Sequence, residues 1–199
     1  MEFDVNNVTM TKSCLTRTTY NQLQKRFIAF DTETTGLRCD SNRIIELGAV
    51  VYENGEIVDK FSSLINTHKM IPYQITKITN ITNDMVNEAP EEDEVYKAFI
   101  KFLGNAMNGE TIICAHNATF DMKFLANTFD RLGYTANFNY IDTLSLSRKY
   151  LKDKLDNFKQ GTIANYFDID VKNAHRAADD ARVCGSILCN LLELYNDFS

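Results

Sequence analysis

The chain lacks the features that mark secreted, membrane or zinc-binding proteins. Its five cysteines are an odd number and form no C-x-x-C pair, which excludes a disulfide framework and argues against a zinc site. No apolar stretch is long enough to cross a membrane, and the N-terminus has no hydrophobic signal core. We therefore expect a cytoplasmic protein with reduced thiols and no association with a membrane.

Positive charge is also scarce. The formal net charge is −6 at pH 7, which argues against a protein that holds nucleic acid through a broadly basic surface. An enzyme that meets phosphate groups locally is still compatible with this balance, because metal ions bound by clustered carboxylates supply positive charge. The 199 residues, of which 44% are hydrophobic and 24% charged, are typical of one globular domain with a substantial core.

Hydrophobic periodicity predicts an α/β domain over residues 26–197. Asn54-Gly55 between two apolar runs is a strong signal for a β-hairpin, and strands then alternate with helices further along the chain. We expect strands near 27–30, 44–52, 57–65, 111–115 and 140–142, and helices near 119–132, 143–151, 161–167 and 176–195. A further helix is expected to begin near Pro90 and the acidic run 91–94, with a buried stripe that reaches Leu103. The result is a mixed five-stranded sheet flanked by helices. Residues 1–25 are polar without a clear period and are interpreted as a poorly defined N-terminal extension, with a short helix near 21–25.

The most informative segment is Asp-Thr-Glu-Thr-Thr-Gly at residues 31–36, which follows the apolar run 27–30. Two acids at alternate positions at the end of a buried strand are costly to bury unless something neutralises them. Divalent cations that prefer oxygen ligands would do so. The alternative is that Asp31 caps a turn and that Glu33 is solvated, and this segment alone does not decide between the two.

Two further acids lie at the ends of predicted helices. Asp121 falls in the first turn of one helix beside its sheet-facing stripe, and Asp180 lies at the edge of the buried face of the last helix. Each could simply favour the helix dipole. His175 precedes Asp180 by five residues, about 140° away on a helix, so it must come from the preceding loop to share a site with it. Four clustered acids would repel one another, whereas two divalent cations would relieve the repulsion and allow phosphodiester hydrolysis, with His175 accepting a proton.

Three segments together resemble a known family. Residues 31–36, His-Asn-Ala-x-Phe-Asp at 116–121 and His-Arg-Ala-x-x-Asp-Ala at 175–181 are similar to the three exonuclease motifs of the DEDDh family of 3′–5′ exonucleases. Within that family they are most similar to the proofreading exonucleases of bacterial DNA polymerase III, either the epsilon subunit or the domain inside Gram-positive replicative polymerases. The resemblance extends over residues 26–195 through the connecting segments 44–50, 61–66 and 141–144.

This resemblance implies an RNase H-like fold and the release of nucleoside 5′-monophosphates with two divalent cations, Mg²⁺ or Mn²⁺. It implies that Asp31 contacts both cations, that Glu33 and Asp180 hold the catalytic one, that Asp121 holds the second, and that His175 is the general base. It further implies that the substrate is bound by Thr34, Gly36, Leu37, Asn117 and Phe120.

The chain departs from the family at Asn80, where a glycine usually precedes Ile81. Asparagine tolerates the left-handed backbone that such a glycine allows, so we expect the same turn. Asp142, at the end of the last predicted strand, resembles a common acid of the family and is interpreted as structural or supporting, not catalytic.

The leading hypothesis for the substrate is the 3′ end of single-stranded or frayed DNA, in proofreading or repair. An exonuclease that trims RNA 3′ ends and a non-catalytic module of a replication complex are the alternatives. The sequence ends at Ser199, soon after the last predicted helix, so we expect the protein either to act alone or to bind a DNA polymerase through a surface other than a C-terminal tail. A locally basic stretch could guide a phosphate backbone, although an ordinary solvated surface is favoured for it; it comprises Arg148, Lys149, Lys152, Lys154 and Lys159.

Overall fold

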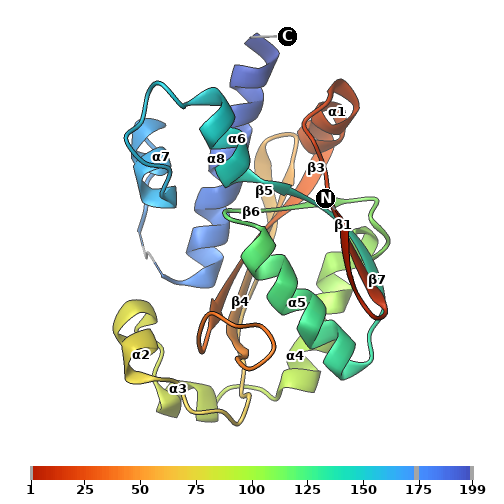
Figure 1. Cartoon of the computed structure of the whole chain (residues 1–199), viewed down its shortest axis with the longest axis vertical. Helices are drawn as coiled ribbons and strands as arrows, with labels where there is room; N and C mark the ends of the chain where they lie inside the picture. Colours follow the sequence, from red (N-terminus) through yellow and green to blue (C-terminus); the bar gives the residue numbers. More distant parts are fainter. Residues whose placement is uncertain (1, 173–174, 198–199) are drawn as a thin grey trace.

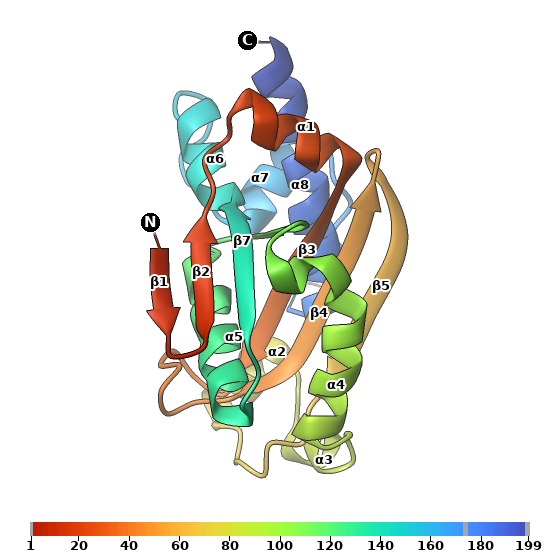
Figure 2. The ribbon, with the colours of Figure 1, turned by 90° about the vertical axis from the view of Figure 1, so that its right-hand side faces the viewer.

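The fold is a mixed β-sheet covered by helices on both faces (Figures 1 and 2). The computed structural model describes residues 2–172 and 175–197, and its sheet has seven strands in the order β1-β2-β7-β6-β3-β4-β5. The predicted α/β class is therefore confirmed, whereas the predicted number of five strands is wrong. The strands are β1 (Glu2–Val5), β2 (Val8–Lys12), β3 (Arg26–Thr34), β4 (Ile44–Glu53), β5 (Glu56–Leu64), β6 (Ile112–Ala115) and β7 (Ala136–Asp142).

The two additional strands come from the segment that was interpreted as a loosely ordered extension. Strand β2 pairs in parallel with β7, from Val8 opposite Ala136 to Lys12 opposite Tyr140, and β1 adds an antiparallel outer strand. Val8 and Met10 are fully buried. The pairing joins segments more than a hundred residues apart, and the short polar sequence has no local pattern that would predict it. The expected short helix is longer than predicted, because α1 spans Arg17–Lys25.

Alternating side chains of β3 enter two separate cores. Ile28 and Phe30 face one core, which also contains residues of α4 and α5, whereas Phe27 and Ala29 face the other, which contains residues of α1, α6, α7 and α8. The helices are α2 (Tyr73–Thr79), α3 (Asn83–Asn87), α4 (Glu92–Leu103), α5 (Thr119–Leu132), α6 (Thr143–Tyr150), α7 (Gln160–Tyr166) and α8 (Ala177–Asp197), and a 3₁₀ helix spans Gly104–Asn108. None of the described helices has both the length and the apolar composition that crossing a membrane requires.

Two predicted turns have the expected backbone. Asn54 and Gly55 join β4 to β5 with positive φ angles of 51° and 82°, as a two-residue hairpin of this sequence requires. Asn80 ends α2 in the left-handed conformation, with φ 57° and ψ 14°. Asn80 therefore adopts the left-handed conformation that is expected for this turn.

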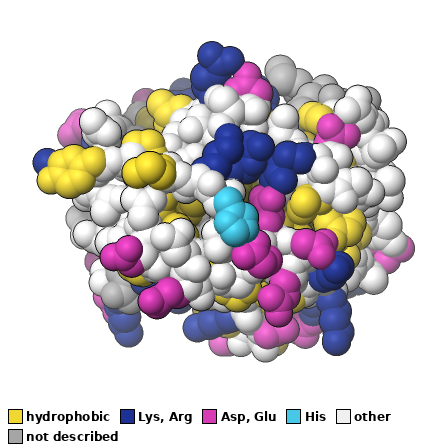
Figure 3. Space-filling model, turned by 90° about the horizontal axis from the view of Figure 1, so that it is seen from below, with side chains coloured by type: hydrophobic (Ala, Val, Ile, Leu, Met, Phe, Trp, Pro, Cys, Tyr) yellow, Lys and Arg dark blue, Asp and Glu magenta, His cyan; other side chains and the backbone are white. Residues whose placement is uncertain are grey.

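Figure 3 shows the end of the molecule that lies below in Figure 1. Hydrophobic, basic and acidic side chains are mixed on this face, and no single charge sign covers it. The three most exposed large apolar side chains of the described residues lie in loops and helix α2: Leu37 is 83% exposed, Met70 84% and Tyr73 69%. This face is therefore not broadly basic.

Candidate active site

The predicted acids come from three elements that meet at one edge of the sheet. Asp31 and Glu33 lie near the end of β3, Asp121 lies in the first turn of α5, and Asp180 lies in the first turn of α8. Strands β3 and β6 are parallel neighbours, so the helix that follows β6 begins at the edge where β3 ends. This topology explains why Asp121 approaches Asp31 although 90 positions separate them.

The start of α8 is fixed against β4 by two contacts. A β-carbon at Gly48 would overlap the backbone of Ala177, so only glycine lets the helix begin this close to the strand. Glu46, which is 1% exposed, accepts hydrogen bonds from Arg176 at 2.7 and 3.0 Å and from the backbone N–H of Ala177 at 3.0 Å. These contacts hold Asp180 toward β3.

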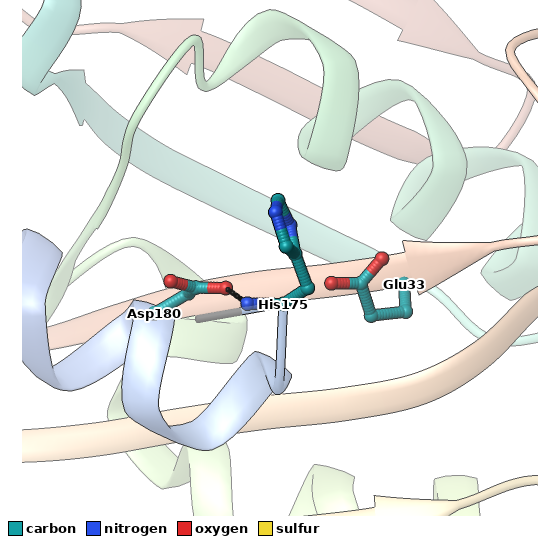
Figure 4. A group of neighbouring side chains, drawn as sticks. All are labelled: Glu33, His175 and Asp180. Atoms are coloured by element: carbon teal, nitrogen blue, oxygen red, sulfur yellow. Dashed lines mark hydrogen bonds between the residues drawn. The ribbon is translucent and has the colours of Figure 1, made fainter. Parts of the chain in front are cut away.

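One cavity of about 640 Å³ brings the predicted catalytic residues together. Its wall includes Asp31, Glu33, Asp121, His175 and Asp180. Glu33, His175 and Asp180 offer oxygen and nitrogen atoms that all lie within 4.8 Å of one another. Figure 4 draws these three side chains, which come from β3, the loop before α8 and α8. The exposed His175 comes from the loop before α8, as the sequence predicted.

Neighbouring groups orient two of the carboxylates. One oxygen of Asp121 accepts hydrogen bonds from the backbone N–H and the hydroxyl of Thr32, at 3.1 and 2.8 Å. One oxygen of Asp180 accepts the backbone N–H of His175 at 2.8 Å, and Gln160 donates to the Asp180 carbonyl oxygen at 2.9 Å. These hydrogen bonds fix the orientation of Asp121 and Asp180 in the cavity.

The acids in the cavity hold their protons more strongly than free carboxylic acids do. Burial, followed by the charges of Asp121, Asp180 and Glu33, raises the pKa of Asp31 well above its ordinary value. Burial and the charge of Asp180 raise the pKa of Glu33 to about 8, and burial raises the pKa of Asp121 to about 7. Burial also raises the pKa of Asp180. The cluster thus disfavours its own full ionisation, and an oxygen-rich donor set of this kind fits hard divalent cations.

The predicted substrate-binding residues fall into two groups. Asn117 and Phe120 line the cavity. Thr34, Gly36 and Leu37 are not among its lining residues; the Thr34 hydroxyl donates to the carbonyl oxygen of Gly36 at 2.7 Å, and Leu37 projects into solvent. The structure therefore brings the first group to the acids, and the role of the second group stays a prediction.

Sequence reasoning assigned no role to His116, although it lies within the second motif. Its Nε2 atom donates to the carbonyl oxygen of Phe158 at 2.9 Å, and its Nδ1 atom lies 3.0 Å from the hydroxyl of Thr143. Burial lowers the pKa of this ring, which favours its neutral form. His116 thereby ties the loop between α6 and α7 to the site. Gln160 was also missed, and nothing in the sequence marks it.

Asp142 occupies the end of β7, beside the cavity. It accepts hydrogen bonds from Lys12 at 2.9 Å, from Ser145 at 2.8 Å, and from the backbone N–H groups of Asn117 and Leu144, both at 3.1 Å. Burial raises its pKa, but these bonds outweigh that effect, so the pKa of Asp142 lies below its ordinary value. It joins the N-terminal strands to the starts of α5 and α6, a structural role that matches the prediction.

Comparison with known families identifies the class of protein. A sequence model described as exonuclease, RNase_T, matches residues 28–188, and the chain belongs to this exonuclease family. The predicted class, a 3′–5′ exonuclease hydrolase with an RNase H-like fold, is thereby confirmed.

Among the relatives, the DNA polymerase III PolC-type of Clostridium perfringens is 41% identical over 162 residues, which are 81% of this chain and 11% of that protein. The PolC-type polymerase of Oceanobacillus iheyensis is 41% identical over 174 residues, 87% of this chain and 12% of that protein. The chain thus spans about an eighth or less of the curated relatives it matches.

Solved exonucleases share the fold. Exonuclease X, solved in complex with 5′ overhanging duplex DNA, is 25% identical with a TM-score of 0.64, covering 86% of this chain and 91% of that chain. Escherichia coli exonuclease I, solved in complex with a dT13 oligonucleotide, is 19% identical with a TM-score of 0.71, covering 87% of this chain and 43% of that chain.

Proposed function

We propose that this protein is a two-metal-ion 3′–5′ exonuclease that removes nucleoside 5′-monophosphates from the 3′ end of single-stranded or frayed DNA. One observation carries the proposal. Four carboxylates and an imidazole, delivered by the end of β3 and the starts of α5 and α8, line one cavity. The raised pKa values of the acids are those of a cluster that gains from binding cations.

Each carboxylate would bind one or both of the two cations. Glu33 and Asp180, whose oxygens lie within 4.8 Å of one another, would hold the catalytic Mg²⁺ or Mn²⁺. Asp121 would hold the second cation and Asp31 would contact both. When bound, such a pair of cations lowers the pKa of the attacking water and stabilises the charge on the leaving oxygen.

His175 is assigned the proton transfer. Its ring lies beside Glu33 and Asp180 at the exposed side of the cavity, so it can accept the proton of the attacking water and release it to solvent. A ring nitrogen at this place could also ligate a cation. We assign it the base role because hard cations of the Mg²⁺ type prefer oxygen ligands, which the four acids supply.

DNA is the proposed substrate because exonuclease X and exonuclease I were solved bound to DNA. Similarity to PolC-type polymerases supports a role in proofreading or repair beside a DNA polymerase. No observation favours RNA trimming over this proposal, and RNA becomes one arm of the test. The cytoplasmic location stays a prediction. A non-catalytic module would have no use for four intact acids in one cavity.

Product analysis tests the proposal. A single-stranded DNA and an RNA of the same base sequence, each labelled at the 5′ end, are incubated with Mg²⁺, Mn²⁺ or EDTA, and the Asp31→Asn variant serves as the inactive control. We expect a ladder of DNA shortened from the 3′ end, nucleoside 5′-monophosphates as the released product, slower loss of RNA, and no reaction in EDTA. Cleavage that persists in EDTA or begins at the 5′ end would contradict the proposal.

A further inference from the structure

A second groove of about 440 Å³ adjoins the active-site cavity. Its wall is formed by His116, Asn117, Leu144, Arg148, Phe158 and Lys159. Three of these residues, His116, Asn117 and Lys159, also line the cavity that holds the acids. The two hollows therefore meet, and a chain that enters the cavity can continue into the groove.

The groove carries positive charge that no acid neutralises. The side chains of Arg148 and Lys159 are exposed, and within residues 2–172 and 175–197 neither forms an ion pair with a carboxylate. Other members of the basic stretch are placed differently, because Lys149 lies over the ring of Tyr150 and Lys154 over that of Tyr166. The sequence favoured a solvated surface for the whole stretch, whereas the structure singles out two of its cations.

Both cations belong to segments that the site itself holds in place. Lys159 directly follows Phe158, whose carbonyl oxygen accepts the hydrogen bond from His116, and the Lys159 backbone N–H donates to Asn157 at 3.1 Å. Arg148 lies one turn after Leu144 on α6, so the two share one face of that helix. The groove therefore presents an apolar side chain and a guanidinium together.

We infer that this groove binds the phosphate backbone of the substrate strand on the 5′ side of the bond that is cleaved. This inference rests on the proposed function. The acids repel a polyanion, so the strand needs cations beyond those held by the carboxylates, and Arg148 and Lys159 are cationic side chains of the groove that adjoins the cavity. Leu144 and Phe158 offer apolar surface for sugars or bases between the phosphate contacts. Contacts with phosphates and with apolar faces are the same for every base, so the groove would bind strands of any sequence.

The test compares substrates that reach the groove with one that does not. The substrates are single-stranded DNA of two to twelve nucleotides, and the p-nitrophenyl ester of thymidine 5′-monophosphate, which is too short to leave the cavity. For the wild-type protein we expect KM to fall as the strand lengthens and fills the groove. In each of the variants Arg148→Gln and Lys159→Gln, we expect the KM of the longest strand to rise by up to about fivefold more than the KM of the ester.

Lys152→Gln is the matched control, because Lys152 belongs to the same basic stretch and is exposed, but it is not among the lining residues of either hollow. The salt dependence adds a readout that a structural defect would not imitate. For single-stranded nucleic acid, the slope of log(kcat/KM) against log[salt] should become shallower by about 0.7 for each phosphate contact removed. Lys152→Gln should keep the wild-type slope.

The outcomes separate the inference from the proposed function. Variants at Arg148 and Lys159 that match Lys152→Gln in length dependence and salt slope would overturn the groove while leaving the exonuclease in place. A wild-type protein that hydrolyses neither the strands nor the ester with Mg²⁺ or Mn²⁺ would overturn the proposed function, and the groove with it.

Discussion

Two sets of buried or half-buried acids lie at the same edge of the sheet and differ in their partners. Glu46 and Asp142 receive cationic and backbone donors, and the hydrogen bonds of Lys12 and Ser145 hold the pKa of Asp142 below its ordinary value. The second set, Asp31, Glu33, Asp121 and Asp180, lines the active-site cavity, and the pKa values of all four are raised. The first set joins elements of the fold. The second set leaves negative charge uncompensated around a cavity, which is the arrangement that a cation site requires.

Removing a ligand from the second set should have the largest effect. We expect Asp31→Ala, Asp121→Ala and Asp180→Ala each to reduce turnover on the order of 10³-fold, because each removes stabilisation of the transition state worth several kcal/mol. Single-turnover rates with Mg²⁺ measure the loss, and circular dichroism with thermal melting checks that each variant is folded. If one of these variants folds and retains the wild-type rate, the residue that it replaces is not a cation ligand.

The next largest effect is expected at His175, which belongs to the cavity but has no carboxylate. His175→Ala should slow hydrolysis by about 10²-fold, because general base catalysis typically contributes at least this much. The dependence of kcat on pH should lose its acidic limb, while binding of Mn²⁺ should persist. An unchanged pH profile would exclude His175 as the base, and loss of Mn²⁺ binding would assign it to the ligands instead.

Asp142→Ala tests the first set of acids. The change removes the carboxylate that accepts from Lys12 and from several backbone N–H groups, so we expect the free energy of unfolding to fall by about 2–3 kcal/mol. The melting temperature should drop by about 4–12 °C for a chain of this size. Activity per folded molecule at low temperature should stay within a few-fold of wild type. A loss of activity per folded molecule as large as that of Asp121→Ala would contradict the distinction between the two sets of acids.

Glu33→Gln should have the opposite effect on stability. The folded state raises the pKa of Glu33 from 4.5 to about 8, so metal-free protein loses stability as pH rises through this window, when the buried carboxylate must ionise. Glutamine does not ionise. We therefore expect the variant to be about 2 kcal/mol more stable than wild type at pH 8.5 in EDTA, and to show little difference at pH 5. If the variant and the wild-type protein have the same melting curve at each pH value, ionisation of Glu33 does not lower the stability of the fold.

The sequence predicted the parts of this contrast that depend on local pattern. The apolar stripes of two helices placed Asp121 and Asp180 at the cavity, and the angle between His175 and Asp180 required the loop position that the structure shows. Asn54-Gly55 specified its hairpin through the backbone conformation that the pair favours.

Features that depend on distant contacts could not be predicted in this way. Strands β1 and β2 form because β7 offers an unpaired edge, and nothing in the Thr- and Asn-rich sequence reports that edge. The pairing of Glu46 with Arg176 joins positions 130 residues apart. The position of Arg148 in a groove beside the cavity likewise depends on a distant contact, because the hydrogen bond between His116 and Phe158 holds the loop between α6 and α7 there.

The central claim is that the unpaired acids, and not the paired ones, form the cation site. Titration with Mn²⁺, followed by electron paramagnetic resonance in the presence of thymidine 5′-monophosphate, tests it most directly. The account predicts two bound ions for the wild-type protein and for Asp142→Asn, and a loss of binding for Asp31→Asn. Mn²⁺ binding by Asp31→Asn that equals that of wild type in number and affinity would contradict it.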